Sequence, residues 1–145
     1  MKIQTKYFGE QEISESDILS FPSGLPGFAQ ERRFILQPFS EVFSILQSLD
    51  QPQLAFVVTS PYLFFENYTL DLPDVFVQQL SIEKPEDVTV WVIVSVQAPL
   101  SESTANLKAP IVLNMRQNLG KQYIAEQSTY SLRERLMMQS LEKRA

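Results

Sequence analysis

Cysteine and histidine are both absent from the 145 residues of this chain. Without cysteine there is no disulfide framework and no thiolate metal site. Without histidine the chain lacks the commonest general base and the commonest metal ligand. Catalytic Ser–His–Asp triads, Cys–His pairs and histidine-containing zinc sites are therefore excluded. No Gly-rich phosphate loop is present either, so the sequence favours a binding protein without a cofactor over an enzyme.

Long apolar runs are also missing. The two longest, Leu54–Val58 and Val90–Val94, contain five residues each, whereas a membrane helix needs about 20. Residues 1–6 are polar and charged, and no apolar signal-peptide core follows them. We therefore expect a cytoplasmic protein without a membrane partner. Ten phenylalanines in a chain of this length indicate a folded protein, which we expect to form one domain over residues 1–145.

The net charge of −5 is unevenly distributed along the chain. Residues 34–107 contain nine acidic side chains and one basic one, Lys84, so this segment carries −8, while the flanking segments carry −1 and +4. Direct nucleic-acid binding is not expected, because it depends on lysine and arginine that displace counterions. An acidic segment suits a basic protein partner, but from the charge alone we favour an acidic surface that only keeps the protein soluble.

Strand patterns dominate the chain, beginning with the alternation of Ile3, Thr5 and Tyr7. Further strands or hairpins are predicted at residues 13–21, 33–39, 54–59, 62–65, 68–72, 89–96, 111–115 and 121–126. Residues 42–49 fit either a helix or a strand. A short helix is predicted over residues 74–80 with Asp74 as its cap. A C-terminal amphipathic helix is predicted over residues 131–143, with a capping box formed by Ser131 and Glu134.

These elements predict a mostly β domain, either an antiparallel barrel or a sandwich, with one or two short helices including the C-terminal one. An oligonucleotide-binding barrel shares the pattern of short strands, but the acidic middle segment argues against it. A small hydrolase that uses carboxylates is the enzyme alternative, and a generic protein-binding β domain is the other alternative.

One candidate partner-binding surface combines aromatic and acidic side chains. Its members are Tyr62, Phe64, Phe65, Glu66, Asp71 and Asp74. Aromatic residues with a charged rim are typical of protein interfaces. If residues 62–65 form a strand, alternation turns one of Phe64 and Phe65 outward. Packing of these rings in the core is the structural alternative, and the carboxylates have no spacing typical of a calcium loop.

Two further candidates lie in loops. Pro26-Gly27 is typical of a type II turn, so Leu25 and Phe28 either form a rigid docking knob or pack into the core, and we favour the core. Thr104 and Asn106 precede a strand. Asn106 either bonds its own backbone in a turn or belongs, with Thr104, to a rim that contacts a partner.

Five short motifs occur in order along the chain. They are the opening Met1-Lys2-Ile3 with Phe8-Gly9-Glu10, the FPSGLPGF segment at 21–28, LQSLD at 46–50, LAFVVT at 54–59, and TANLKAPIV at 104–112. Together they resemble the FliW family of flagellar assembly factors. Each motif alone is short, but their order covers most of the chain. The chain departs from the family pattern at Gln51, Gln53 and Ser60, where acidic residues are frequent.

The resemblance implies a protein with two partners. Members of the family bind flagellin in the cytoplasm, and the C-terminal helical region of flagellin is the expected contact. When flagellin is exported, the freed protein binds CsrA, a repressor of flagellin translation, and inhibits it allosterically. If the acidic surface contributes to this binding, the neutral residues at Gln51, Gln53 and Ser60 weaken it.

Overall fold

The structure is a computed structural model that describes residues 1–125 and 128–138. Its strands are β1 (Lys2–Thr5), β2 (Gly9–Glu12), β3 (Leu19–Ser20), β4 (Arg33–Pro38), β5 (Ser44–Ser48), β6 (Ala55–Thr59), β7 (Val88–Ser95), β8 (Thr104–Ala105), β9 (Ile111–Asn114), β10 (Leu119–Gln122) and β11 (Glu134–Arg135). Its helical elements are α1 (Asp74–Gln79) and the 3-10 turns η1 (Glu15–Asp17), η2 (Pro61–Leu63), η3 (Pro85–Asp87) and η4 (Leu100–Glu102). Among the described residues, no helix is long and apolar enough to cross a bilayer.

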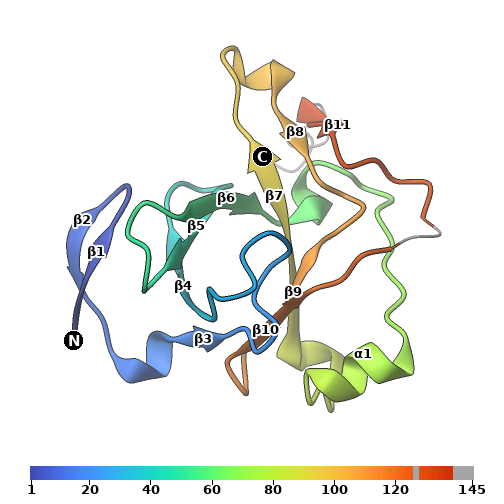
Figure 1. Cartoon of the computed structure of the whole chain (residues 1–145). Coiled ribbons are helices and arrows are strands. Elements are labelled where there is room, and N and C mark those ends of the chain that lie inside the picture. The colour runs from blue at the N-terminus through green and yellow to red at the C-terminus, as the bar shows by residue number, and fades with distance from the viewer. Residues whose placement is uncertain (126–127, 139–145) are drawn as a thin grey trace.

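Seven strands close into a barrel (Figure 1). The order around it is β7-β6-β5-β4-β3-β10-β9, and β9 pairs again with β7. All neighbours are antiparallel except β10 and β3, which meet in parallel at Leu119 and Ser20. This arrangement confirms the prediction of a mostly β antiparallel barrel. Strand β7 is the longest, and its last residues leave the barrel to pair with β8, which in turn pairs with β11.

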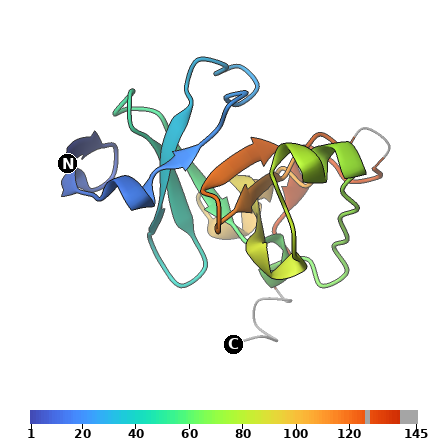
Figure 2. The same cartoon turned by 90° about the horizontal axis from the view of Figure 1, so that it is seen from below.

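The N-terminal hairpin β1–β2 is a separate two-stranded sheet. It lies on the opposite side of the barrel from α1, as both views show (Figures 1 and 2). Gln47 joins the hairpin to the barrel, because its fully buried Oε1 accepts a hydrogen bond from the Lys6 N–H at 2.9 Å. The Gln47 amide nitrogen donates to carbonyls of the β5–β6 turn, including that of Pro52 at 3.0 Å. One side chain thus satisfies backbone groups of two segments.

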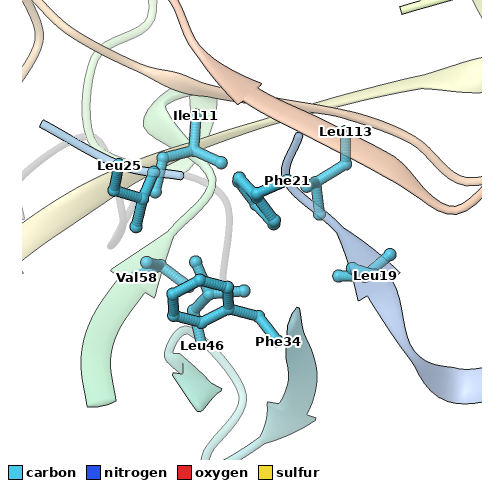
Figure 3. Close-up of a cluster of buried hydrophobic side chains, with 8 residues drawn as sticks. All are labelled: Leu19, Phe21, Leu25, Phe34, Leu46, Val58, Ile111 and Leu113. Atoms are coloured by element: carbon cyan, nitrogen blue, oxygen red, sulfur yellow. The ribbon is translucent and has the colours of Figure 1, made fainter. Parts of the chain in front are cut away.

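The barrel interior is filled by apolar side chains from opposite walls (Figure 3). The buried cluster consists of Leu19, Phe21, Leu25, Phe34, Leu46, Val58, Ile111 and Leu113. The Phe21 and Phe34 rings meet edge to face at 5.1 Å in its centre. A second buried cluster, between β7, β8 and residues 64–70, contains Phe64, Tyr68, Val92, Val94, Ala105, Leu107 and Leu136.

The turn at Pro26-Gly27 has the predicted geometry. Gly27 has φ +84°, the positive value that a type II turn requires at its third position. The Phe28 N–H donates to the Leu25 carbonyl at 2.7 Å. Leu25 is 2% exposed and lies in the barrel core, whereas Phe28 is 39% exposed and its ring rests edge-on against Phe56. The expectation that both side chains enter the core is therefore right for Leu25 and wrong for Phe28.

Several predicted elements differ in the structure. Residues 13–21 are not one strand, because η1 interrupts them and only Leu19–Ser20 pairs. The ambiguous segment 42–49 contains the strand β5. Residues 62–65 and 68–72 contain no strand, since Pro61 begins a 3-10 turn after β6. In α1 the cap is Pro73, and Asp74 is the first helical residue without a capping hydrogen bond.

The prediction of a helix starting at Ser131 is wrong. Glu134 and Arg135 pair with Ala105 and Thr104 as the edge strand β11. Half of the proposed capping box exists, because the Ser131 N–H donates to the Glu134 carboxylate at 3.1 Å, but it closes a bend before a strand. Leu136, which the helical spacing assigned to a helix face, is buried in the second cluster. Residues 139–143 of the predicted helix lie outside the described residues.

Candidate functional site

An apolar groove of about 790 Å³ runs along the outside of β7, between this strand and the segment that connects β6 to β7. Its lining consists of Ser60, Tyr62, Leu70, Leu72, Val77, Ile82, Glu83, Lys84, Pro85, Val88, Thr89, Val90 and Trp91. This size and apolar character are typical of binding sites. The groove is therefore the main candidate functional site.

The long β6–β7 connection forms the outer wall of this groove. Pro61 ends β6 and starts η2, which turns the chain away from the barrel. Helix α1 buries Phe76 against the rest of the protein, and Phe76 meets the Tyr123 ring of the segment after β10 at 5.1 Å. The adjacent Val77 lines the groove. The wall is thus fixed to the barrel by its buried residues while its other side chains remain available.

Three tyrosines brace one end of the wall. The Tyr62 ring meets Tyr68 at 5.8 Å, and Tyr68 meets Tyr130 at 4.8 Å. The Tyr68 hydroxyl donates to the Leu107 carbonyl at 3.0 Å, and the Tyr130 hydroxyl accepts from the Thr69 N–H at 3.1 Å. Burial raises the pKa of Tyr62, with a smaller contribution from Tyr130, and burial likewise raises the pKa of Tyr68 well above its usual value. Tyr62 and Tyr68 therefore stay uncharged at neutral pH.

Folding neutralises part of the acidic middle segment. Four of its nine carboxylates form ion pairs with arginines from outside residues 34–107: Asp50 with Arg33, Glu83 and Asp87 with Arg116, and Glu102 with Arg135. The Arg33 hydrogen bond lowers the pKa of Asp50. Within the described residues, the other five carboxylates have no ion-pair partner and are exposed: Glu41, Glu66, Asp71, Asp74 and Glu86.

Four of these five free carboxylates belong to the groove wall or border it. Asp71 lies between the lining residues Leu70 and Leu72, and Glu86 follows Pro85. Glu66 and Asp74 lie on the same connecting segment. Lys84 is the single basic residue of the segment 34–107, and it also lines the groove. The connection that forms the groove wall therefore carries four free carboxylates, here called the acidic rim, and one lysine, while the groove lining itself is mainly apolar. Within residues 1–125 and 128–138, no three carboxylates converge to hold a metal ion.

The structure separates the six residues of the predicted aromatic and acidic surface. Phe64 is fully buried, and Phe65 is partly buried against the same cluster. The argument that strand alternation turns one of them outward does not apply, because this segment is not a strand. Of the three aromatic residues in this predicted surface, Tyr62 is the one that lines the groove, and 38% of its surface is exposed. Glu66, Asp71 and Asp74 are exposed as expected.

The loop candidates lie elsewhere. Asn106 forms the predicted turn, in which its Oδ1 accepts a hydrogen bond from the Ala109 N–H at 3.0 Å. Thr104 is in β8 and lines a separate polar hollow with Glu102 and Arg133. Phe28 lies beside Phe56 of β6. Neither Leu25, Phe28, Thr104 nor Asn106 belongs to the groove lining.

Sequence reasoning missed most of the groove. The residues Leu72, Val77, Ile82 and Trp91 were not identified as candidates, because apolar side chains in short elements read as core. One signal was present in the sequence: Pro61 comes two residues after Thr59, the last residue of the predicted strand 54–59. Such a proline ends pairing and leaves part of a neighbouring strand without a partner.

A model of the FliW protein family matches residues 2–136 of the chain. The chain belongs to the FliW family. It is 44% identical over 144 residues to the flagellar assembly factor FliW of Geobacillus thermodenitrificans (strain NG80-2), an alignment that covers 99% of this chain and 100% of the relative. It is 47% identical over 132 residues to the flagellar assembly factor FliW of Bacillus licheniformis, covering 90% and 92% of the two chains.

A solved structure agrees with this assignment. The chain superposes on the crystal structure of a flagellar assembly factor FliW with a TM-score of 0.92 and 44% sequence identity, covering 94% of this chain and 97% of that one. The barrel described above is therefore the FliW fold, and the resemblance identified from five motifs is confirmed.

Proposed function

We propose that this protein is a cytoplasmic, non-enzymatic regulator that binds flagellin and, when free of flagellin, binds and antagonises CsrA. Membership of the FliW family supports the role in flagellar assembly, and the relatives carry the name flagellar assembly factor. The observation that carries the proposal is the apolar groove with its acidic rim. The enzyme alternative receives no support from this groove, because Glu83 is its one lining carboxylate and is paired with Arg116 at 2.9 Å.

Flagellin is proposed to place an apolar segment of its C-terminal region in the groove. Tyr62, Leu72 and Trp91 offer the aromatic and aliphatic contacts on which binding energy usually concentrates. A segment that packs inside the assembled filament has apolar side chains that must be covered before export. The groove provides such a cover without a large rearrangement, because its outer wall is already fixed by Phe76 and the tyrosines.

CsrA is proposed to contact the free carboxylates on the same wall. Glu66, Asp71 and Asp74 are exposed and unpaired among the described residues, so they retain the charge that steers association with a basic partner. Because these residues alternate along the chain with groove-lining residues, the two partners overlap on one segment. Overlap explains a switch without a conformational change, and linkage requires each partner to weaken the other by the same factor.

A competition experiment tests the proposal. Flagellin is titrated into a preformed complex with CsrA, and the species are separated by size-exclusion chromatography. We expect flagellin to displace CsrA. A stable ternary complex in which both affinities are unchanged would show that the two sites are separate.

A matched pair of variants locates the site. Tyr62→Glu charges the groove, whereas Phe39→Glu charges an exposed ring, 55% accessible, beside the N-terminal hairpin and outside the groove. We expect Tyr62→Glu to weaken flagellin binding by 2 kcal/mol or more, about the magnitude of a hot spot, and Phe39→Glu to bind like the parent protein. Equal affinities for both variants would remove the groove from the proposal.

A further inference from the structure

One edge of β7 is open inside the groove. The Asp87 carbonyl accepts a hydrogen bond from the Met115 N–H at 3.0 Å. In an antiparallel ladder, hydrogen-bonded pairs alternate with non-bonded pairs. Since Asp87 and Met115 form a bonded pair, Thr89 and Trp91 are the next β7 residues that bond to β9. The backbone N–H and C=O of Val90, between them, therefore point away from β9. On that side β6 pairs with β7 only at Val58–Ile93 and Thr59–Val92.

The chain itself prevents β6 from covering this edge. Two residues beyond the Thr59–Val92 pair, the register would place Pro61 opposite Val90. Pro61 has no N–H to donate, and it begins the turn η2 that leads away from the sheet. The Val88 N–H is already bonded to the Pro85 carbonyl at the end of η3. Among the described residues, the N–H and C=O of Val90 and the C=O of Val88 thus remain without a hydrogen bond.

The surroundings of this edge suit an added strand. Val88 and Val90 line the groove together with Leu70 and Leu72, and both valines are only partly buried. An unpaired edge with apolar pockets beside it is the template that proteins use for strand addition, in which main-chain bonds give affinity and alternate side chains give specificity.

We propose that the groove binds its partner as an extended strand added to β7 at Val88–Val90. The proposal rests on the function proposed above and specifies the conformation of the bound flagellin segment. The added strand is antiparallel to β7, and one of its residues, here called X, lies opposite Val90. The carbonyl of X accepts from the Val90 N–H, and the N–H of X donates to the Val90 carbonyl. The N–H of the residue two positions after X donates to the Val88 carbonyl. The side chains of these two partner residues are apolar, because they lie on the same face as Val88 and Val90.

The rim specifies the charge of the partner. Glu66, Asp71, Asp74 and Glu86 are free, exposed carboxylates on the connection that forms the groove wall, against one lysine, Lys84, in the lining. The bound segment is therefore flanked by lysine or arginine rather than by acidic residues. A short apolar segment in extended form with basic flanks is the occupant, and a helix with an apolar face is the competing outcome that the test must separate.

Hydrogen exchange at a single amide provides the first measurement. In the free protein we expect the Val90 N–H to exchange fast and the Trp91 N–H, bonded to β9, to be protected and to serve as the internal control. On addition of full-length flagellin we expect exchange at Val90 to slow at least tenfold, with Trp91 unchanged. An added strand supplies the Val90 N–H with a new acceptor, whereas a helix lying over the groove only shields it from solvent, because the helix backbone groups bond one another. Protection at Val90 therefore supports the inference only together with the peptide pattern described next.

N-methylated peptides provide the second measurement, and they leave the protein unaltered. Short overlapping peptides from the C-terminal region of flagellin are tested by calorimetry, and the peptide that binds is methylated at one backbone nitrogen at a time. We expect methylation at X and at the residue two positions later to weaken binding about tenfold each, as the loss of one backbone hydrogen bond predicts. Methylation at the residue between them leaves the affinity unchanged.

The outcomes separate the two proposals. If Tyr62→Glu abolishes flagellin binding but Val90 stays unprotected and the alternating pattern is absent, the groove is the site and the strand inference is wrong. If flagellin does not bind the protein at all, the proposed function fails and the strand inference fails with it. Protection of the Val90 N–H, together with weaker binding on methylation at alternate peptide nitrogens, supports both the proposed function and the strand inference.

Discussion

Substitution of Gly120 by alanine tests whether the FPSGLPGF motif serves the barrel core. A Cβ at position 120 would lie 2.4 Å from Cζ of Phe21 and 2.7 Å from both Cε atoms, closer than any real Cβ contact. Phe21 has no room to withdraw, because its ring is fully buried and meets Phe34 at 5.1 Å (Figure 3). Gly120 does not have a positive φ, so the substitution introduces a clash without backbone strain.

The expected effect follows from overpacking. Forcing an extra methyl group into a filled core lowers the free energy of unfolding by about 1–3 kcal/mol. For a chain of this size each kcal/mol moves Tm by about 2–4 °C, so we expect Gly120→Ala to lower Tm by roughly 2–12 °C. Thermal unfolding followed by circular dichroism, with urea unfolding to measure the free energy, provides the assay.

A double-mutant cycle identifies the cause. Phe21→Leu removes the ring atoms that the new methyl group would meet, so Gly120→Ala is expected to cost at least about 1 kcal/mol less in that background. The reasoning is refuted if Gly120→Ala leaves Tm unchanged, or if it costs the same with leucine as with phenylalanine at position 21.

Three further predictions concern the second cluster and the groove. Phe64→Glu is expected to prevent folding, because it buries an unpaired charge where the ring is fully covered. The control, Tyr62→Glu, is expected to give a native circular dichroism spectrum. A folded Phe64→Glu protein would contradict the structure. The raised pKa of Tyr68 keeps its phenol neutral in the folded state, so its contribution to stability is fully present below the unfolded pKa of about 10. The contribution falls as pH rises above that value, by up to about 1.4 kcal/mol per pH unit. Tyr68→Phe should reduce this alkaline slope in urea titrations from about pH 9 upward, with Tyr62, whose pKa is also raised, leaving a residual slope; an unchanged slope would contradict the assignment to Tyr68. The triple variant Glu66→Gln, Asp71→Asn and Asp74→Asn replaces three free rim carboxylates by neutral amides. It should associate with CsrA more slowly in stopped-flow measurements, and its association rate should depend less on salt. Rates equal to those of the parent protein would exclude these carboxylates from CsrA binding.

Local patterns in the sequence were reliable where a residue type permits one geometry. The type II turn followed from Pro26-Gly27, since proline presets φ and glycine accepts the positive φ of +84°. The strand at 89–96 followed from a continuous apolar run, and β7 occupies Val88–Ser95 at the centre of the fold. The family was evident from five motifs in order along the chain, and the family model accordingly matches residues 2–136.

Local patterns failed where distant partners compete with them. The spacing of Leu132 and Leu136 fits a helix, but Glu134 and Arg135 gain strand pairing with β8, and Leu136 gains burial in the second cluster. Likewise, residues 62–65 have strand-like composition, but Pro61 at the end of β6 imposes a 3-10 turn that buries Phe64. In both cases tertiary contacts contribute more than intrinsic preference.

The sequence by itself determined the mostly β class, the exclusion of histidine and cysteine chemistry, the acidic middle segment and the family. Only the tertiary structure decided which charges stay free, since Arg33, Arg116 and Arg135 neutralise four carboxylates that are distant in the chain. It also decided where the site lies, because the open edge at Val90 arises from the register of three strands and from Pro61. Register and ion pairing join residues far apart along the chain, and a linear pattern does not contain that information.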